Sequence, residues 1–584
     1  MPTSKPTKAN ALPPASALLD ALFDYLAARP QHARPHGGAA GGVSRARKSS
    51  RPPWACRRPP SLRCFHNYFV THLPSSSLHP DPGSIAGPHH KLPRSASTPH
   101  TAEPGSSRSQ AVVPPDLPDR NNVTVVRIPL RSAKHHFGAS NSRGSRVYNE
   151  DTNQAGTINM PAFAKRSPVS LVRSQLSRSS GEGTNADSAF GDPQVFYFAV
   201  FDGHGGAECS DFLRDELHGY VEEAAEHFAL QSSLRRPRAQ AREGRAPDVV
   251  PTPVPVHLES ELVQEYRDTV GGYFRRFRPI YFNLPPSSSA QRKASARAPV
   301  PDEARPAAAP ATVETVLTYA FLRADLDFIT AQARKPDPDD PYVADIPLNK
   351  DEVLGHPSHR PPSGHGIGGP SRFKGGSTAS LALISTPTPA PFWHPAAQST
   401  LVVAHVGDTR VLLCETASGL PIPLTSDHHP SAPSESRRLM RYAADSLVTD
   451  SFGEERIAGL ANSRAFGDMQ SKRVGVSAEP DITRVDLGPA QYSFLVLMSD
   501  GVSGSLSDQE IVDVVKEART PDEGARKVVE YATEVSSDGD NATCLVVRLG
   551  GWERRSEGGL GSLGTKEIRD VRRAEALDPR RGRQ

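Results

Sequence analysis

The chain has 584 residues, of which 36% are hydrophobic and 6% aromatic, and it contains 56 prolines and 45 glycines. Long stretches of such composition cannot bury enough apolar surface to offset their ordering entropy, so we expect one large domain with disordered additions. The net charge of +3 is too near balance for the whole protein to bind polyanions. Five widely spaced cysteines imply neither a disulfide framework nor a Cys-x-x-Cys zinc site.

The first 135 residues are predicted to be a disordered basic region. From Tyr25 to Ala111 the only acids are Asp81 and Glu103, against many Arg, Ser and His residues. This bias is typical of an organellar transit segment. The alternative is a generic basic tail or a mispredicted start, which would leave the protein in the cytoplasm or nucleus. We expect no nucleic-acid partner, because the region shows no aromatic interleaving and no folded module. We also expect no transmembrane segment, since no apolar stretch approaches the roughly 18 residues that a spanning helix needs.

The predicted elements of the first half begin with a strand at 123–128. A fully apolar strand at 195–201 then leads into a Gly-rich turn at 202–206. Apolar residues at helical spacing predict helices at 207–230, 258–277 and 313–333. Pro-, Ala- and Arg-rich insertions near 231–311, on either side of the helix at 258–277, and near 335–372 are expected to be mobile surface loops.

The second half is predicted to be rich in strands, at 378–384, 400–406, 410–415, 493–498 and 542–549. Their apolar runs lack polar alternation, which favours sheets covered on both faces. Capping boxes at Ser507–x–x–Glu510 and Thr520–x–x–Glu523 predict two further helices. Strands and helices grouped in this way indicate an α+β fold. We expect the domain to span 136–550, with a disordered tail at 551–584.

Five acidic residues lie in turns or beside predicted strands: Glu150, Asp151, Asp202, Asp500 and Asp540. Each alone is more often a turn or strand-end cap. Together they suit Mg²⁺ or Mn²⁺, which prefer oxygen ligands. Two such cations can clamp both oxygens of an in-line displacement, so the sequence predicts a metal-dependent phosphate-ester hydrolase.

The chain resembles the metal-dependent Ser/Thr protein phosphatases of type 2C. The motifs that carry the resemblance are Arg-Val-Tyr-Asn-Glu-Asp at 146–151, Asp-Gly-His-Gly-Gly at 202–206, Gly-Ser-Thr-Ala at 376–379, Gly-Asp-Thr-Arg at 407–410, Leu-Ala-Asn-Ser-Arg-Ala-Phe-Gly-Asp at 460–468, Ser-Asp-Gly at 499–501 and Asp-Asn at 540–541. They follow the family's order across about 136–550. The resemblance implies an α-β-β-α sandwich, in which two face-to-face antiparallel sheets are flanked by helices and carry a binuclear metal centre at one end.

The resemblance also implies roles for individual residues. The two Mn²⁺ or Mg²⁺ ions would be held by Asp202, which bridges both, by the Gly203 carbonyl, by Asp500 and Asp540, and by Glu150 and Asp151 directly or through water. Arg146 would grip the substrate phosphate, and His204 would protonate the leaving serine or threonine oxygen. Water bridged between the ions would then attack phosphorus directly. A solvated surface Arg146 and a structural His204 remain the alternatives.

One departure from the family pattern concerns the position four residues after Asp500, where many members have an acid and this chain has Gly504. In the family that acid helps to hold a third metal together with the aspartate of the Gly-Asp-Thr-Arg motif, here Asp408, so we assign no third metal. A purely structural role remains the alternative for Asp408 and for Asp468. Gly504 and the insertions also motivate an alternative function, a weakly active or inactive binding or regulatory module. A nuclease is less favoured because no basic groove is apparent. The N-terminal bias is similar to that of the family's fungal mitochondrial branch, so we expect a mitochondrial location. Separately, we expect the protein to be a monomer whose partners are phosphoprotein substrates.

Overall fold

The computed structural model describes residues 136–166, 192–234, 255–284, 311–335, 367–388, 390–440, 447–451, 453–556 and 563–578, and the backbone of three strands further towards the N-terminus. Those three strands are β1 (Tyr68–Pro74), β2 (Ser97–Pro99) and β3 (Val123–Pro129), which pair in the order β1-β3-β2. The strand predicted at 123–128 is therefore present as β3. The rest of the predicted disordered basic region and most of the predicted insertions lie outside the described residues.

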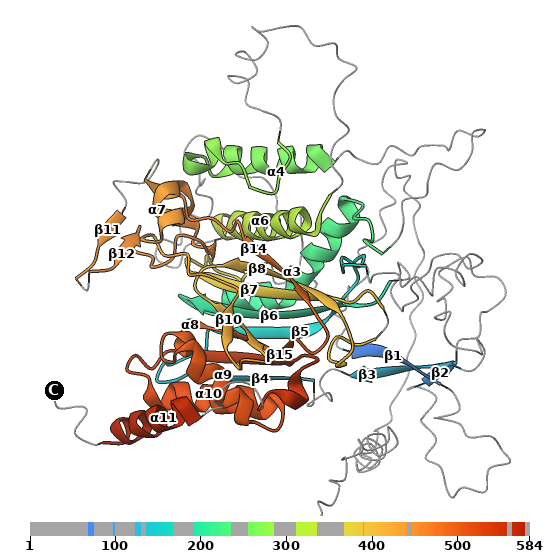
Figure 1. Ribbon diagram of the computed structural model, residues 1–584. Coiled ribbons are helices and arrows are strands. Elements are labelled where there is room, and N and C mark those ends of the chain that lie inside the picture. Colours follow the sequence, from blue (N-terminus) through green and yellow to red (C-terminus); the bar gives the residue numbers. More distant parts are fainter. Residues whose placement is uncertain are drawn as a thin grey trace, which may run out of the picture.

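Two antiparallel sheets form the centre of the domain (Figure 1). The first contains β5 (Thr152–Ile158), β6 (Val195–His204), β7 (Gly376–Ser385), β8 (Ser399–Val406), β13 (Phe466–Gly467) and β14 (Asp481–Leu487). The second contains β4 (Phe137–Ser142), β9 (Arg410–Glu415), β10 (Pro421–Pro423), β15 (Tyr492–Met498) and β16 (Ala542–Arg548). The strand orders are β14-β8-β7-β6-β5, with β13 paired to β7, and β10-β9-β15-β16-β4.

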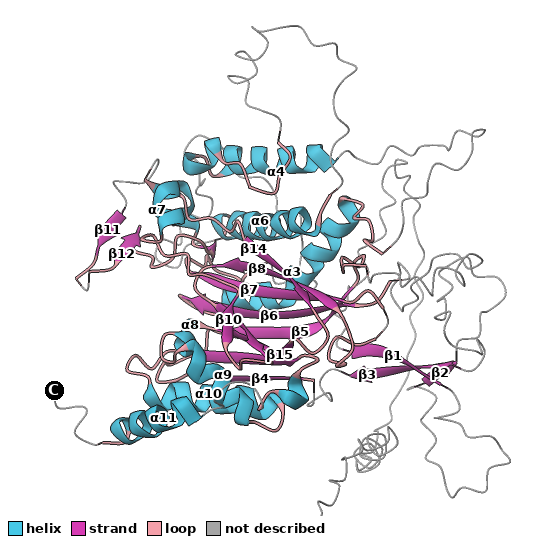
Figure 2. Cartoon of the chain, viewed as in Figure 1, coloured by secondary structure: helices cyan, strands magenta, loops and turns pink. Residues whose placement is uncertain are grey.

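Helices cover the outer face of each sheet (Figure 2). Over the first sheet lie α3 (Glu208–His227), α6 (Val313–Ala333) and, further out, α4 (Pro255–Thr269); over the second lie α9 (Asp508–Glu517), α10 (Pro521–Val535) and α11 (Leu563–Ala576). The short α7 (Pro433–Leu439) and the hairpin of β11 (Leu447–Thr449) and β12 (Glu455–Ile457) project at one side. The single turn α8 (Asp500–Ser503) and the 3-10 turns η4 (Gly272–Arg276), η7 (Met469–Val474) and η8 (Trp552–Arg554) complete the elements. The predicted α-β-β-α sandwich is confirmed.

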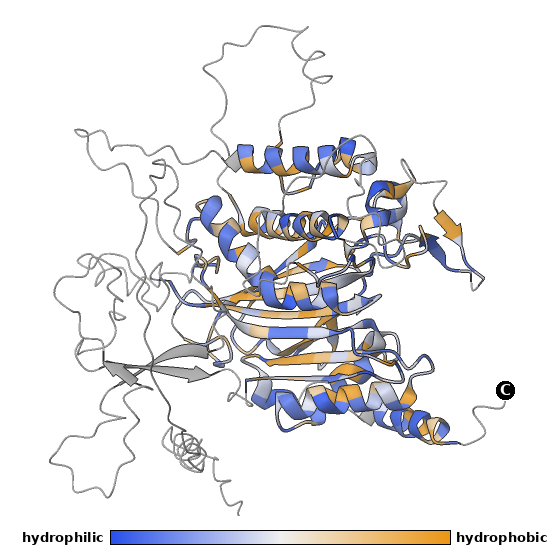
Figure 3. Ribbon diagram, turned by 180° about the vertical axis from the view of Figure 1, so that it is seen from behind, coloured by the Kyte–Doolittle hydropathy of each residue, from blue (hydrophilic) through white to orange (hydrophobic). Residues whose placement is uncertain are grey.

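The apolar run of β6 shows why this fold suits the sequence. Phe196 and Phe198 belong to the buried cluster between the two sheets, whereas Tyr197 and Phe201 belong to the cluster under α3 and α6. Because successive side chains of a strand point to opposite faces, a strand covered on both sides must be apolar at every position. The same concentration of apolar residues on the strands is visible in Figure 3.

Most of the predicted helices and strands are present with shifts of a few residues, and α6 spans the predicted 313–333. The helix predicted at 258–277 is instead α4 followed by η4, because Gly271 and Gly272 have φ angles of 68° and 52°, which break a right-handed helix. The strands β4, β5 and β14 and the helix α7 were not predicted.

The predicted disordered tail at 551–584 is wrong where the structure describes it. It contains η8, with Trp552 buried, and the docked helix α11. The residues that α11 buries include Thr565 and Arg569, so its contact face carries no apolar periodicity for the sequence to show. Among the described helices, none combines the length and apolarity that a bilayer crossing demands.

Candidate active site

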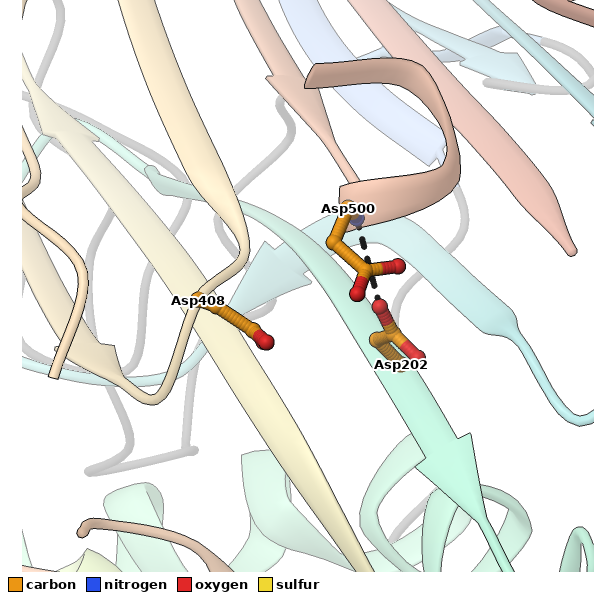
Figure 4. A group of neighbouring side chains, drawn as sticks. All are labelled: Asp202, Asp408 and Asp500. Atoms are coloured by element: carbon orange, nitrogen blue, oxygen red, sulfur yellow. Dashed lines mark hydrogen bonds between the residues drawn. The ribbon is translucent and has the colours of Figure 1, made fainter. Parts of the chain in front are cut away.

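Three aspartates from distant parts of the sequence converge at one end of the sandwich. Asp202 lies near the end of β6, Asp408 lies in the turn between β8 and β9, and Asp500 is the first residue of α8. One carboxylate oxygen of each lies within 4.8 Å of the others (Figure 4). The backbone N–H of Asp500 donates to Asp202 Oδ2 at 3.3 Å, so the start of α8 is fastened to β6.

The local sequence explains why two of these acids approach so closely. Gly501 follows Asp500, and a Cβ on it would lie 1.9 Å from the carbonyl oxygen of Asn541. Gly407, with a φ of 101°, precedes Asp408, and a Cβ there would lie 2.2 Å from the Thr378 side chain. Glycine at 407 and 501 therefore allows the turns that carry Asp408 and Asp500 to pack closely against neighbouring backbone and side chains.

The acid cluster is electrostatically strained in the absence of a cation. Burial raises the pKa of Asp202 well above its usual range, and the charges of Asp500, Asp151 and Asp408 raise it further. Burial, followed by the charges of Asp408 and Asp540, raises the pKa of Asp500 to about 7. Carboxylates that are costly to ionise side by side are stabilised by a positive charge among them.

Asp151 and Asp540 extend the acid cluster beyond the three central residues. Asp151 Oδ2 accepts a hydrogen bond of 2.7 Å from Ser499, the residue before Asp500. Its Oδ1 is buried and has no hydrogen-bond partner among the described residues. Burial raises the pKa of Asp151 to about 6, against the lowering effect of hydrogen bonds such as that of Ser499. An orphaned carboxylate oxygen of this kind suits a cationic ligand.

Gly203 and Glu150 are brought together by backbone contact. A Cβ on Gly203 would lie 2.5 Å from the carbonyl oxygen of Glu150 and 2.9 Å from Ser210 Oγ, so only glycine fits. Ser210 Oγ donates to that Glu150 carbonyl, which fixes the turn beside β6. The predicted metal residues thus lie in one neighbourhood, and their donors are all oxygens. Such a set fits Mg²⁺ or Mn²⁺ and does not fit metals that prefer sulfur or imidazole.

Asn541 organises the acidic turn, a role that nothing in the sequence indicates beyond its place after Asp540. Its Nδ2 donates to the carbonyls of Arg143 and Tyr148, each at 3.0 Å. Its Oδ1 accepts the backbone N–H of Glu150 at 2.8 Å. One amide, donating two hydrogen bonds and accepting a third, therefore holds the loop at 143–150 against the start of β16.

Arg146 lies at the rim of this site. Its side chain is 56% exposed, and Nη2 donates to Asp540 Oδ2 at 2.9 Å. A guanidinium at the edge of the acid cluster can pair with an anionic group there, since its fork matches the oxygens of a phosphate. The structure places Arg146 beside Asp540, and its role towards a substrate phosphate stays a prediction.

His204 is held by Asp468. The Nε2 atom of His204 lies 2.9 Å and 3.0 Å from the two oxygens of Asp468, whose side chain is only 4% exposed. Burial alone would lower the pKa of His204, but the hydrogen bond and the charge of Asp468 outweigh it, so the pKa is raised. A Cβ on Gly376 would lie 2.4 Å from Asp468 Oδ2, so glycine there makes room for the carboxylate.

Sequence reasoning left two of these contacts unassigned. The sequence leaves the role of Asp408 open because of Gly504, whereas the structure places Asp408 in the central cluster with Asp202 and Asp500. It also leaves the role of Asp468 open, whereas the structure shows Asp468 as the partner of His204. The signal that could have found both was their place in two further motifs of the same series, since Asp408 is the second residue of 407–410 and Asp468 is the last residue of 460–468.

Comparison with known proteins gives consistent similarities. A family model described as Protein phosphatase 2C matches residues 369–540. Protein phosphatase 2C homolog 4 of Schizosaccharomyces pombe is 29% identical over 438 residues, which cover 75% of this chain and 86% of that protein. Protein phosphatase 1K, mitochondrial, of Xenopus laevis is 39% identical over 153 residues, which cover 26% of this chain and 40% of that protein.

Among solved structures, a serine-threonine phosphatase 2C from Toxoplasma gondii matches with a TM-score of 0.37 and 18% identity. That match covers 71% of this chain and 94% of the other. The chain therefore spans most of the fission-yeast relative but less than half of the Xenopus relative.

Proposed function

The chain belongs to the protein phosphatase 2C family of protein serine/threonine phosphatases, and from this premise we propose that it uses two Mn²⁺ or Mg²⁺ ions to hydrolyse phosphoserine and phosphothreonine in phosphoproteins. The observation that carries the proposal is the convergence of Asp202, Asp408 and Asp500, with Asp151 and Asp540 beside them. These residues, together with the Gly203 carbonyl and Glu150, would hold the cations. When bound, such cations lower the pKa of water and neutralise charge on phosphate oxygens.

Arg146 is the residue of the chain that would bind the substrate phosphate. Its exposed guanidinium can turn from Asp540 to a phosphate without leaving the site, because both partners accept the same N–H donors. Binding at this point orients the phosphorus atom over the acidic end of the sandwich. A lysine would supply charge but not the two parallel hydrogen bonds.

His204 would protonate the leaving oxygen. Because Nε2 of His204 contacts Asp468, Nδ1 is the ring nitrogen that would donate the proton to the leaving oxygen. The Asp468 carboxylate would stabilise the charged imidazolium. In the reaction, the oxygen of a water molecule forms a new bond to phosphorus and that water releases one proton to solvent. The bond from phosphorus to the serine or threonine oxygen breaks, that oxygen takes a proton from His204, and solvent then reprotonates the imidazole. Because water itself attacks, no phosphoenzyme is expected.

The deciding experiment is hydrolysis of p-nitrophenyl phosphate and of a phosphopeptide by the full chain, with Mn²⁺ and with EDTA. We expect turnover with Mn²⁺, loss in EDTA, and loss in Asp202→Ala. Asp486→Asn is the matched control, because Asp486 is an exposed acid on β14 that pairs with Lys165. Undiminished activity in EDTA, or none with Mn²⁺, would refute the proposal.

The alternative is a binding or regulatory module with little activity, motivated by Gly504. It predicts that a phosphoprotein partner still binds when Asp202 is replaced by alanine and that wild type turns over no faster than the variant. The assay above therefore separates the two functions.

We further propose that residues 136–550 form the catalytic domain of a monomer located in mitochondria. The acid-poor N-terminal composition supports the location, and one relative, from Xenopus laevis, is named a mitochondrial phosphatase. Imaging a C-terminal fluorescent fusion tests the location, and a diffuse cytosolic signal would contradict it. Light scattering of the purified chain tests the monomer.

A further inference from the structure

The segment 460–468 contacts both halves of the candidate site. At its start, Asn462 Nδ2 donates to Asp408 Oδ2 at 2.7 Å. At its end, Asp468 accepts the hydrogen bond of His204. Between them, Arg464 Nη2 lies 2.6 Å from the buried Glu435 Oε1, so the segment has a rigid anchor. Asn462 is thus well placed to act on the acid cluster from a fixed support.

The orientation of the Asn462 amide follows from its partner. An ionised carboxylate can only accept hydrogen bonds, so the NH₂ group of the amide must face Asp408. This leaves Asn462 Oδ1, which is buried and has no hydrogen-bond partner among the described residues. Buried acceptors normally find a donor. Hydration water of a cation held by Asp408 would supply one, so this unpaired oxygen is a second sign that the amide serves a ligand site.

The other side of Asp408 offers no comparable support from the α8 turn. Gly504 has no side chain, and its N–H donates to the Asp500 carbonyl at 2.6 Å. A Cβ there would lie 2.9 Å from the same carbonyl oxygen. The neutral amide of Asn462 therefore contacts Asp408 without adding another negative charge to a cluster whose carboxylates already repel one another.

We propose that Asn462 is a positioning residue that holds the Asp408 carboxylate towards Asp202 and Asp500, and that it thereby raises the affinity of the site for divalent cations. The inference rests on the proposed function, because it assumes that the acid cluster binds those cations. Residues that orient metal ligands through hydrogen bonds commonly change metal affinity by about 10- to 100-fold when replaced.

The test is a double-mutant cycle on Mn²⁺ affinity, measured with the full chain by electron paramagnetic resonance of free Mn²⁺, without substrate. The variants are Asn462→Leu, Asp408→Asn and the two combined. We expect Asn462→Leu to weaken Mn²⁺ binding about 10-fold in the wild-type background and to have little further effect when Asp408 is already asparagine. Leucine is chosen because it has a similar volume and leaves no room for a replacing water.

The matched control is Asn159→Leu, which changes an exposed asparagine just after β5. It should leave Mn²⁺ affinity unchanged. Thermal unfolding in EDTA checks that each variant is folded; if Asn462→Leu is not, Asn462→Ala takes its place with the same expectation.

Three results would overturn the inference. These are Mn²⁺ affinity within twofold of wild type in the Asn462 variant, an equal weakening in both backgrounds, or unchanged affinity in Asp408→Asn. The proposed function fails by a different result, namely a wild-type chain that binds Mn²⁺ and does not hydrolyse phosphoesters. The two failures are therefore distinguishable.

Discussion

Replacing Asp500 by asparagine should make the cation-free protein more stable while abolishing its stabilisation by Mn²⁺. In the structure the Asp500 carboxylate is half-buried and faces Asp202 and Asp408. Without a cation, ionising it costs free energy through lost hydration and through repulsion. Asparagine keeps the shape and removes the charge, so the variant avoids that cost.

The size of the effect follows from the pKa of Asp500, which rises from 3.8 to about 7 on folding. At about 1.4 kcal/mol per pKa unit, this difference corresponds to about 4 kcal/mol. Because the folded-state pKa lies above the unfolded one, the protonated carboxyl is favoured by folding. The associated stability is present below about pH 4 and is lost as the pH rises to about 7. Asp500→Asn should therefore gain about 4 kcal/mol at pH 8 and less than half of that at pH 5.

Urea unfolding of the full chain in EDTA, at pH 5 and pH 8, measures the difference. Asp486→Asn is the control, because burial alone would raise the pKa of this carboxyl but hydrogen bonds from Lys165 and Thr400 lower it, so its removal should be neutral or slightly destabilising. Saturating Mn²⁺ should stabilise wild type and the control but not Asp500→Asn. A cation-free Asp500→Asn variant no more stable than wild type at pH 8 would refute the electrostatic account of the site.

Asp468→Asn should lower the pKa of His204, so the alkaline limb of the pH–rate profile should move to lower pH and kcat at pH 8 should fall about 100-fold; an unmoved limb would contradict the role given to Asp468. Arg572→Ala should destabilise the domain by about 3 kcal/mol, because it leaves the nearly buried Glu510 carboxylate without its cationic partner at 2.9 Å. The exposed pair of Arg526 with Glu530 supplies the control, because Arg526→Ala should lower the free energy of unfolding in urea by less than about 1 kcal/mol. An equal loss of stability in both variants would show that α11 is not docked as described.

The parts of the fold that the sequence predicts are those with strong local signals. The unbroken apolar run of β6 and the caps of α9 and α10 belong to this class. Ser507 and Glu510 form the full capping box that the sequence indicates. At Thr520 only the side-chain cap is present, because Glu523 accepts from the N–H of Arg519 instead. The type of element was predictable in both cases, but the partner of one glutamate was not.

The parts that escape prediction depend on partners far away in the chain. The helix α11 docks through polar side chains: Thr565 donates to Asp513 at 2.7 Å, and Arg569 pairs with Glu517 at 2.7 Å. The composition of this polar face does not differ from that of a solvated tail. Only the acidic partners on α9 identify it as a docked face. Charge patterns alone therefore cannot distinguish a docked polar helix from a disordered segment.

The acid cluster shows the same division at the level of chemistry. Asp202 and Asp500 could be named from the sequence because Asp202 directly follows the apolar run 195–201 and Asp500 comes two residues after the apolar strand β15. Asp408 also lies in a turn after an apolar strand, but whether it belongs to the site depends on which residues contact it in the folded protein. The absence of an acid at 504 argued against Asp408, whereas the hydrogen bond from Asn462, 54 residues away in sequence, argues for it. A neutral amide can hold a carboxylate in a crowded acidic site at a lower electrostatic cost than another acid. If Asn462 acts in this way, the missing acid indicates a different way of holding Asp408 and is not a mark of lost activity.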